Sequence, residues 1–79
     1  MNDDISVTHS LDASGLACPM PLLKAKQGLN TLNRGETLKV IATDPGSVRD
    51  FRAFAQLSGN ELISFVESDN HYIYILKKA

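Results

Sequence analysis

Residues 5–43 read ISVTHSLDASGLACPMPLLKAKQGLNTLNRGETLKVIAT, and this stretch decides the fold because it contains a strand, a helix and a second strand in succession. Apolar and polar residues alternate over residues 5–12, which is typical of a strand with one buried face. Gly15 breaks that pattern, a helix is predicted over residues 18–32, and a second strand is predicted over residues 36–43. Such a unit crosses over right-handed and pairs its two strands in parallel.

The predicted first helix carries its apolar residues on one stripe, namely Leu22, Ala25, Leu29 and Leu32. Proline is favoured at the first helical position because that N–H group has no partner within the helix, so Pro19 is predicted to start the helix. Gly28 lies inside the helix, where glycine costs about 1 kcal/mol relative to alanine. Close packing against a neighbouring element would account for this glycine.

The second half of the chain predicts one more helix and a hairpin. Asp44-Pro45-Gly46 is typical of a turn. Ser47 is predicted to cap a helix that runs to about Ser58, with Asp50 as its capping-box partner. Two strands, over residues 62–67 and 72–77, are then joined by a hairpin.

The element order βαβαββ predicts an α/β fold, a two-layer sandwich in which two helices cover one face of a mixed four-stranded sheet. Helices packed on so small a sheet leave little room for a deep pocket. In the last strand Tyr72 and Tyr74 point to one face, and Ile73 and Ile75 point to the other. If the helices cover the isoleucines, both tyrosines lie on the open face, where they suit a protein contact. A partly exposed aromatic pair without that role fits equally well.

The chain has 79 residues and a net charge of -1. Its length predicts a single domain over residues 1–79, with residues 1–4 as a disordered end. The sequence has no run of about 18 apolar residues, so no membrane span is expected, and its acidic start does not resemble a secretory signal. The balanced charge is not typical of an autonomous nucleic-acid binder. We expect a cytoplasmic monomer that contacts neither a membrane nor, by itself, a nucleic acid.

Cys18 is the only cysteine, which excludes an internal disulfide and a two-cysteine redox cycle. A lone cysteine is most often a buried, inert residue, so a reactive role for Cys18 needs support from its position in the fold. At the entry of a helix, a thiolate faces the positive end of the helix dipole, which favours ionisation. Pro21 has no N–H group, so Met20 is the only first-turn donor left for the sulfur. The sequence therefore predicts a rigid, exposed and readily ionised thiol.

Four basic residues are candidates for partner binding: Lys24, Lys26, Arg49 and Arg52. The two lysines follow Cys18 within two turns of the first helix, and the two arginines lie at the start of the second. All four could bind an acidic partner. Solvated surface charge accounts for them as well.

His9 and His71 are the only histidines, and nothing in the sequence places either one as a base. His9 falls on the apolar side of its strand, which favours a partly buried imidazole, and His71 falls in the hairpin. A metal site needs three or four converging ligands, and one cysteine with two unplaced histidines is weak evidence for such a site. We therefore expect no metal and no catalytic triad, but a lone nucleophile whose partners supply the remaining groups.

The segment LDASGLACPMP at residues 11–21 resembles the signature L-D-x-x-G-L-x-C-P-x-P of the TusA/SirA-like sulfur carriers. Residues 35–40 and 44–51 are similar to the same family, and the resemblance extends to about residue 77. It implies the same βαβαββ sandwich. It also implies that Cys18 accepts sulfur as a transient persulfide from a cysteine desulfurase and passes it to a downstream acceptor protein, with no other cofactor.

Four neighbours of Cys18 are expected to support its loop and the helix start: Gly15, Pro19, Met20 and Pro21. In this family the best-known pathway is tRNA 2-thiouridine formation, and molybdenum-cofactor enzymes are another destination of the sulfur. The tRNA-thiolation members are expected to carry an acidic residue between the two prolines, where this chain has Met20. The resemblance leaves the donor, the acceptor and the final product open.

Two other functions also fit the sequence. One is a non-catalytic regulatory or interaction module that uses the open sheet face with Tyr72 and Tyr74. The other is a redox sensor in which peroxide converts Cys18 to a sulfenic acid.

Overall fold

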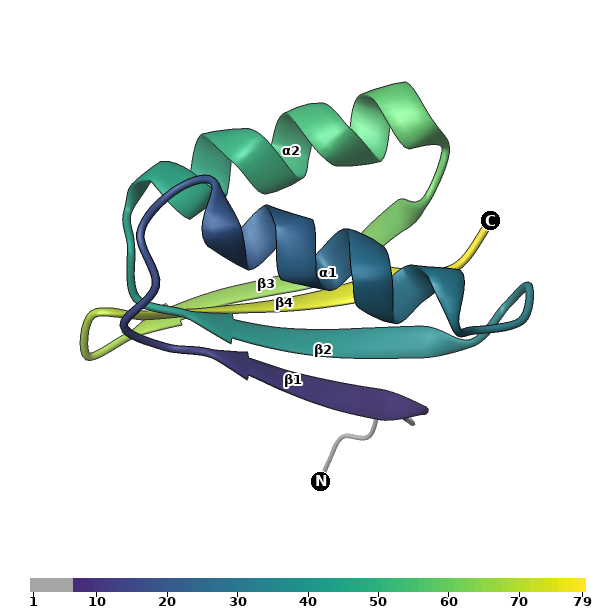
Figure 1. The fold of residues 1–79 in the computed structure, drawn as a ribbon, viewed down its shortest axis with the longest axis horizontal. Helices are drawn as coiled ribbons and strands as arrows, with labels where there is room; N and C mark the ends of the chain where they lie inside the picture. Colours follow the sequence, from purple (N-terminus) through teal and green to yellow (C-terminus); the bar gives the residue numbers. More distant parts are fainter. Residues whose placement is uncertain (1–6) are drawn as a thin grey trace.

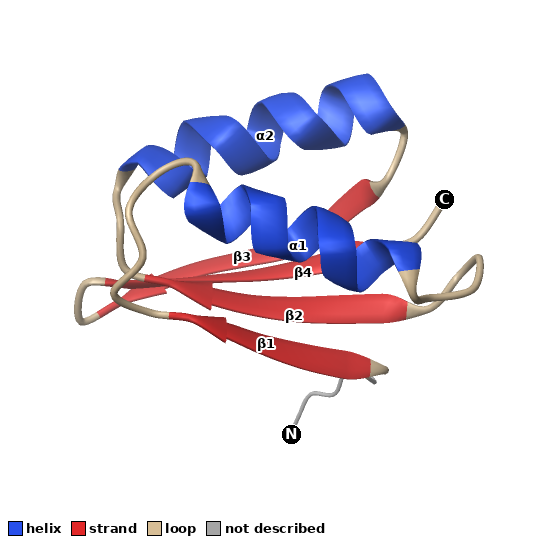
Figure 2. Cartoon of the chain, in the orientation of Figure 1, coloured by secondary structure: helices blue, strands red, loops and turns tan. Residues whose placement is uncertain are grey.

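The computed structural model describes residues 7–79, so the end predicted at residues 1–4 and Ile5 of the predicted first strand lie outside the described residues. The elements are β1 (His9–Ala13), α1 (Met20–Asn30), β2 (Thr37–Ala42), α2 (Gly46–Ser58), β3 (Glu61–Ser68) and β4 (His71–Lys77) (Figure 2). Their order is the predicted βαβαββ, although β1 begins only at His9. Within residues 7–79 no helix combines the length and the apolar character that crossing a bilayer requires.

The strands form one mixed sheet in the order β1-β2-β4-β3. β1 pairs with β2 in parallel, and β4 lies antiparallel to both β2 and β3. The hairpin between β3 and β4 turns at Asp69 and Asn70, which both have positive φ angles, of 50° and 63°. Aspartate and asparagine tolerate this left-handed conformation, and such a turn matches the twist of the strands. The mixed four-stranded sheet is therefore as predicted.

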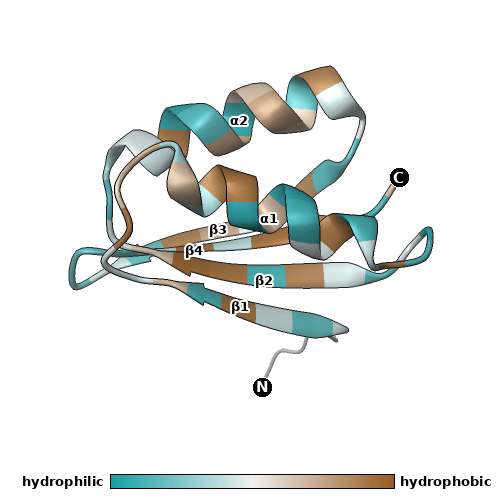
Figure 3. Cartoon of the chain, in the orientation of Figure 1, coloured by the Kyte–Doolittle hydropathy of each residue, from teal (hydrophilic) through white to brown (hydrophobic). Residues whose placement is uncertain are grey.

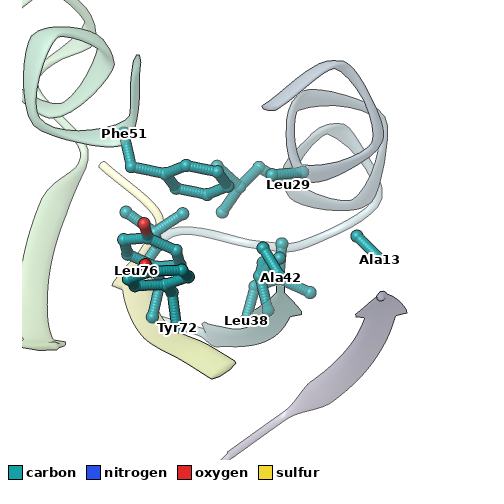
Figure 4. Close-up of a cluster of buried hydrophobic side chains, with 10 residues drawn as sticks. Ala13, Leu29, Leu38, Ala42, Phe51, Tyr72 and Leu76 are labelled. Carbon is teal, nitrogen blue, oxygen red and sulfur yellow. The ribbon is translucent and has the colours of Figure 1, made fainter. Parts of the chain in front are cut away.

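Both helices cover the same face of the sheet (Figure 1). Leu29 of α1 and Phe51 of α2 reach from the helices towards the strands that carry Leu38 and Leu76 (Figure 4). The ring of Phe51 stacks on that of Tyr74, with 4.1 Å between the ring centroids. This buried layer between helices and sheet confirms the two-layer sandwich.

The helices cover the tyrosine side of β4, not the isoleucine side. Tyr74 is fully buried and Tyr72 is 9 % exposed, whereas Ile73 and Ile75 lie half-buried on the open face. The cause is the register between β4 and β2: Tyr74 pairs with Val40, whose side chain is also in the core. The placement of both tyrosines on the open face, as a protein contact, is therefore wrong.

The start of α2 also differs from the prediction. Ser47 does not cap the helix, because it is buried and its hydroxyl lies 2.7 Å from that of Tyr74. The N-cap residue is Pro45, which makes no side-chain capping bond. Asp44 satisfies the first N–H groups instead: its Oδ1 accepts from Gly46 at 3.1 Å, and its carbonyl oxygen accepts from Ser47 at 3.0 Å.

Gly28 allows α1 to lie directly on β2. A Cβ atom at this position would lie 3.2 Å from Cδ2 of Leu38, a tighter contact than most Cβ atoms make, so Leu38 would have to shift. The residues of the predicted apolar stripe are buried or partly buried beside it: Leu22, Ala25, Leu29 and Leu32. Hydrophobic and hydrophilic segments accordingly alternate along both helices (Figure 3). Close packing therefore accounts for the glycine inside α1.

Candidate functional site

Cys18 lies in the loop between β1 and α1. Parallel strands bring their carboxyl ends to the same edge of a sheet, so this loop lies beside the loop between β2 and α2 (Figure 1). Gly15, with a φ of 80°, turns the first loop. Its N–H group donates to Oγ1 of Thr43 in the second loop at 2.9 Å. The two loops are thus joined a few residues before the cysteine.

The helix predicted over residues 18–32 is shorter: it begins at Met20, one residue after the predicted first helical residue Pro19, and ends at Asn30. Pro19 is the N-cap residue, Met20 is the first helical residue, and Pro21 is the second. The peptide bond between Cys18 and Pro19 is cis. Pro21 is buried, and Met20 is 42 % exposed. The N–H group of Met20 donates to the carbonyl oxygen of Ala17 at 2.8 Å, so the donor that the sequence assigned to the sulfur is already used.

The hydrogen-bond partners of Cys18 are two carboxylates, not the N–H groups of the helix. The backbone N–H of Cys18 donates to Oδ2 of Asp44, and its thiol donates to Oδ2 of Asp50 at 2.5 Å. Asp50 belongs to α2, so its contact with Cys18 joins the starts of the two helices. Cys18 is half-buried, and the side chain of Asp50 is 18 % exposed. Cys18 is therefore partly exposed, and its thiol is hydrogen-bonded to α2.

These neighbours make the thiol harder to ionise. The hydrogen bond to Asp50 is the main cause of a raised pKa for Cys18; partial burial and the negative charges of Asp50 and Asp44 raise it further, and Arg49 lowers it. The prediction of a readily ionised thiol is therefore wrong. The prediction fails because the hydrogen-bond partner of the sulfur is a carboxylate and not a helix N–H group. At neutral pH the resting side chain is a thiol.

Asp44 anchors both loops as an anion. The N–H groups of Cys18 and Gly46 donate to its two oxygens, and these bonds hold the pKa of Asp44 below its usual range. Asp44 thus fixes the backbone of Cys18 to the start of α2. Its ionised form is the one that the site needs.

The basic residues considered for partner binding are all exposed: Lys24, Lys26, Arg49 and Arg52. Nε of Arg49 lies 3.8 Å from Oδ1 of Asp50, whose other oxygen accepts the hydrogen bond of the Cys18 thiol. Lys26 instead lies over the ring of Phe54, and Arg52 lies over the ring of Phe65 on β3. Of these four residues, the structure thus places Arg49 beside the Cys18 site through Asp50.

An open groove of about 430 Å³ runs between α1 and α2. Its lining includes Leu22, Phe54 and Leu57, together with Lys26 and Asp50. Leu57 is 88 % exposed. Because Asp50 also holds the thiol, the groove reaches the neighbourhood of Cys18. The sequence predicted only that a deep pocket is absent; this shallow groove depends on how far apart the helices pack.

Within residues 7–79 no group of three or more His, Cys, Asp or Glu side chains could hold a metal ion. His9 is exposed, so the partly buried imidazole predicted for it is wrong. The reason is that His9 is the first residue of β1, which lies at the edge of the sheet. His71 is exposed in the hairpin, and its Nδ1 lies 2.9 Å from the carbonyl oxygen of Asp69.

Sequence reasoning missed Asp44 and Asp50 as residues of the site. The sequence places Asp44 in a turn and Asp50 in a capping box. A usable signal was present for Asp44: if β1 and β2 are parallel, the residue after β2 must lie near the loop that follows β1. Asp50 carried no comparable signal, because its contact with Cys18 depends on how α2 is rotated about its axis.

The family model described as sulfurtransferase TusA matches residues 9–78 of this chain. The chain is 54 % identical over 71 residues to the sulfur carrier protein TusA of Allochromatium vinosum, a match that covers 90 % of this chain and 93 % of that protein. The crystal structure of a SirA-like protein from Desulfitobacterium hafniense superposes with a TM-score of 0.79 at 24 % identity, covering 89 % of this chain and 96 % of the other. At that identity, the structural likeness bears on the fold alone.

Proposed function

The chain belongs to the TusA family of sulfurtransferases, and we propose that it carries sulfur as a persulfide on Cys18. The donor in this proposal is a cysteine desulfurase, and the recipient is a downstream acceptor protein. The observation that carries the proposal is the free, half-buried thiol of Cys18, in the loop that leads into α1. A carrier of this kind needs a thiol but no second cysteine and no cofactor.

The loading step is a thiol–persulfide exchange. The sulfur of Cys18 attacks the outer sulfur of the donor persulfide, so that a new S–S bond forms at Cys18 while the S–S bond of the donor breaks. The thiol proton of Cys18 is lost, and the donor sulfur leaves as a thiolate that takes up a proton. The donor cysteine is reduced by the same two electrons by which Cys18 is oxidised, so no other oxidant is needed. Unloading is the same exchange with an acceptor thiol as the nucleophile.

We place the acceptor in tRNA thiolation, in molybdenum-cofactor assembly or in another branch of sulfur metabolism. Met20, between the two prolines that follow Cys18, is 42 % exposed and so is open to contact with an acceptor. It presents an apolar thioether where the tRNA-thiolation members are expected to present a carboxylate. An acceptor that matches this chain therefore needs an apolar contact next to its own sulfur.

Incubation with a cysteine desulfurase and free cysteine tests the proposal directly. We expect the intact protein to gain the mass of one sulfur atom, about 32 Da, which a reductant removes by thiol exchange. The Cys18→Ser variant should gain nothing, because its hydroxyl is not a nucleophile for persulfides under these conditions. A wild-type protein that stays unmodified beside an active desulfurase would contradict the proposal.

The two other functions considered are less well supported. Cysteines that sense peroxide are exposed and have a low pKa, whereas the pKa of Cys18 is raised by its contact with Asp50. The interaction module loses the two tyrosines on which it was based, because Tyr72 and Tyr74 are buried under the helices. No observation favours either function over sulfur transfer.

A further inference from the structure

We propose that Asp50 is a positioning residue that holds Cys18 as a neutral thiol between transfers and has to release the sulfur before Cys18 can attack a persulfide. The inference rests on the proposed function of Cys18 and adds a control on its reactivity. Asp50 acts on the reacting sulfur through one hydrogen bond, from the thiol to its Oδ2.

The carboxylate of Asp50 lies between two partners of opposite character. Its Oδ2 accepts the hydrogen bond of the half-buried Cys18 thiol, while its Oδ1 lies 3.8 Å from Nε of Arg49. The side chain of Arg49 is 84 % exposed, so this cation is free to follow the carboxylate outwards. A turn of Asp50 towards Arg49 would free the sulfur without breaking any backbone hydrogen bond of α2.

The charged groups that act on the thiol come from two segments. Asp44 belongs to the loop before α2, and Asp50 and Arg49 belong to α2 itself. With Asp50 in contact, ionisation of Cys18 would break a hydrogen bond and set a thiolate against a carboxylate, and Asp44 adds to the repulsion. The thiolate is the reactive form of a cysteine. The resting site is therefore poorly reactive towards peroxide and small disulfides.

Loading then requires a partner that removes Asp50 from the sulfur. As the carboxylate turns away, the thiol proton passes to solvent, and the thiolate attacks the donor persulfide. A basic side chain of the donor, or Arg49 itself, would hold the displaced carboxylate. The hydrogen bond thus directs the sulfur of Cys18 to a docked protein and away from small electrophiles.

The rate of alkylation by iodoacetamide, measured against pH, tests this role without any sulfur donor. Asp50→Asn should react at least about threefold faster than wild type at neutral pH, with its titration midpoint moved to lower pH, because the thiolate is stabilised when a carboxylate is removed. Asp50→Glu keeps the charge and should stay closer to wild type. Glu61→Gln, at the exposed start of β3, removes an equal charge at the opposite end of the sheet and should leave the profile unchanged.

Arg49→Gln provides a second variant, at an exposed position where loss of folding is not expected. Because Arg49 lowers the pKa of Cys18, its removal should slow alkylation, opposite in sign to Asp50→Asn. A midpoint for Asp50→Asn that equals or exceeds that of wild type would overturn the inference. So would an Arg49→Gln variant that reacts faster.

Mass analysis of desulfurase loading on the same variants separates this inference from the proposed function. If alkylation shifts as expected but wild type never gains sulfur, the proposed function fails and the control of the thiol by Asp50 stands. If wild type loads normally but the alkylation profiles of wild type and Asp50→Asn coincide, the inference fails alone.

Discussion

The helix end next to Cys18 carries about half a positive elementary charge, whereas Asp50 and Asp44 each bring a full negative charge to the same place. The two prolines also lack N–H groups, and the N–H of Met20 is bonded to Ala17. The carboxylates therefore determine the protonation of the sulfur. A cysteine at a helix N-terminus is activated only where the N–H groups actually point at it.

A buried hydrogen bond joins Ser47 to Tyr74, whose hydroxyls lie 2.7 Å apart in the core. Ser47→Ala should lower the free energy of unfolding by about 1–3 kcal/mol, because it leaves a buried phenol hydroxyl without a partner. Tyr74→Phe should lower the free energy of unfolding by a similar amount, because it leaves the buried hydroxyl of Ser47 without this partner. Urea denaturation of both single variants and of the double variant measures the coupling.

The double variant, Ser47→Ala with Tyr74→Phe, removes both polar groups and should cost less than the two single changes added together. Strict additivity would show that the two hydroxyls do not depend on each other.

Among the elements, α1 and β2 make the closest approach at Gly28, where a side chain would meet Leu38. Gly28→Val should destabilise the protein by about 1–3 kcal/mol, since the added methyl groups overpack a site enclosed by a fully buried leucine. Loss of conformational freedom in the unfolded chain would oppose this effect only in part. Urea denaturation reports the free-energy change.

Gln27→Val is the matched control for the Gly28 variant. Gln27 is the preceding residue of α1 and is exposed, so valine there should cost less than about 1 kcal/mol, through helix propensity alone. Equal losses in the two variants would show that α1 does not pack on β2 through Gly28.

For the whole molecule, stability depends on the contact between the helical layer and the sheet, and Tyr74 lies at the centre of that contact. Burial raises the pKa of Tyr74, and the hydrogen bond from Ser47 opposes the shift only in part. The folded phenol therefore ionises at higher pH than the unfolded one. Its contribution to stability is complete below the unfolded pKa, near about 10, and is lost as the pH rises through the folded pKa.

Urea midpoints measured between neutral and strongly alkaline pH test this dependence. We expect the wild-type midpoint to fall above about pH 10, the ordinary range of tyrosine. The urea midpoint of Tyr74→Phe should be lower than that of wild type at neutral pH. It should fall less steeply as the pH rises, because this variant has no phenol to ionise at position 74. Parallel curves for the two proteins would contradict a role for Tyr74 in alkaline unfolding.

Much of this protein was predictable from local patterns in its sequence. Alternation identified the strands, the stripe through Ala25 and Leu29 identified the buried side of α1, and the hairpin residues marked the final turn. The motif around Cys18 identified the family and the residue that we propose to carry sulfur. These features depend on neighbours close along the chain, so the sequence contains them directly.

Only the tertiary structure decided which face of β4 the helices cover and what surrounds the sulfur. Tyr72 and Tyr74 alternate with isoleucines, which also suit a core, so the choice of face depends on the pairing with β2. Asp50 lies 32 residues from Cys18, and it meets the thiol because the parallel strands bring both loops to one edge and α2 turns its carboxylate inwards. The physical reason is that protonation depends on distance in space, and that distance is settled only when the helices pack on the sheet.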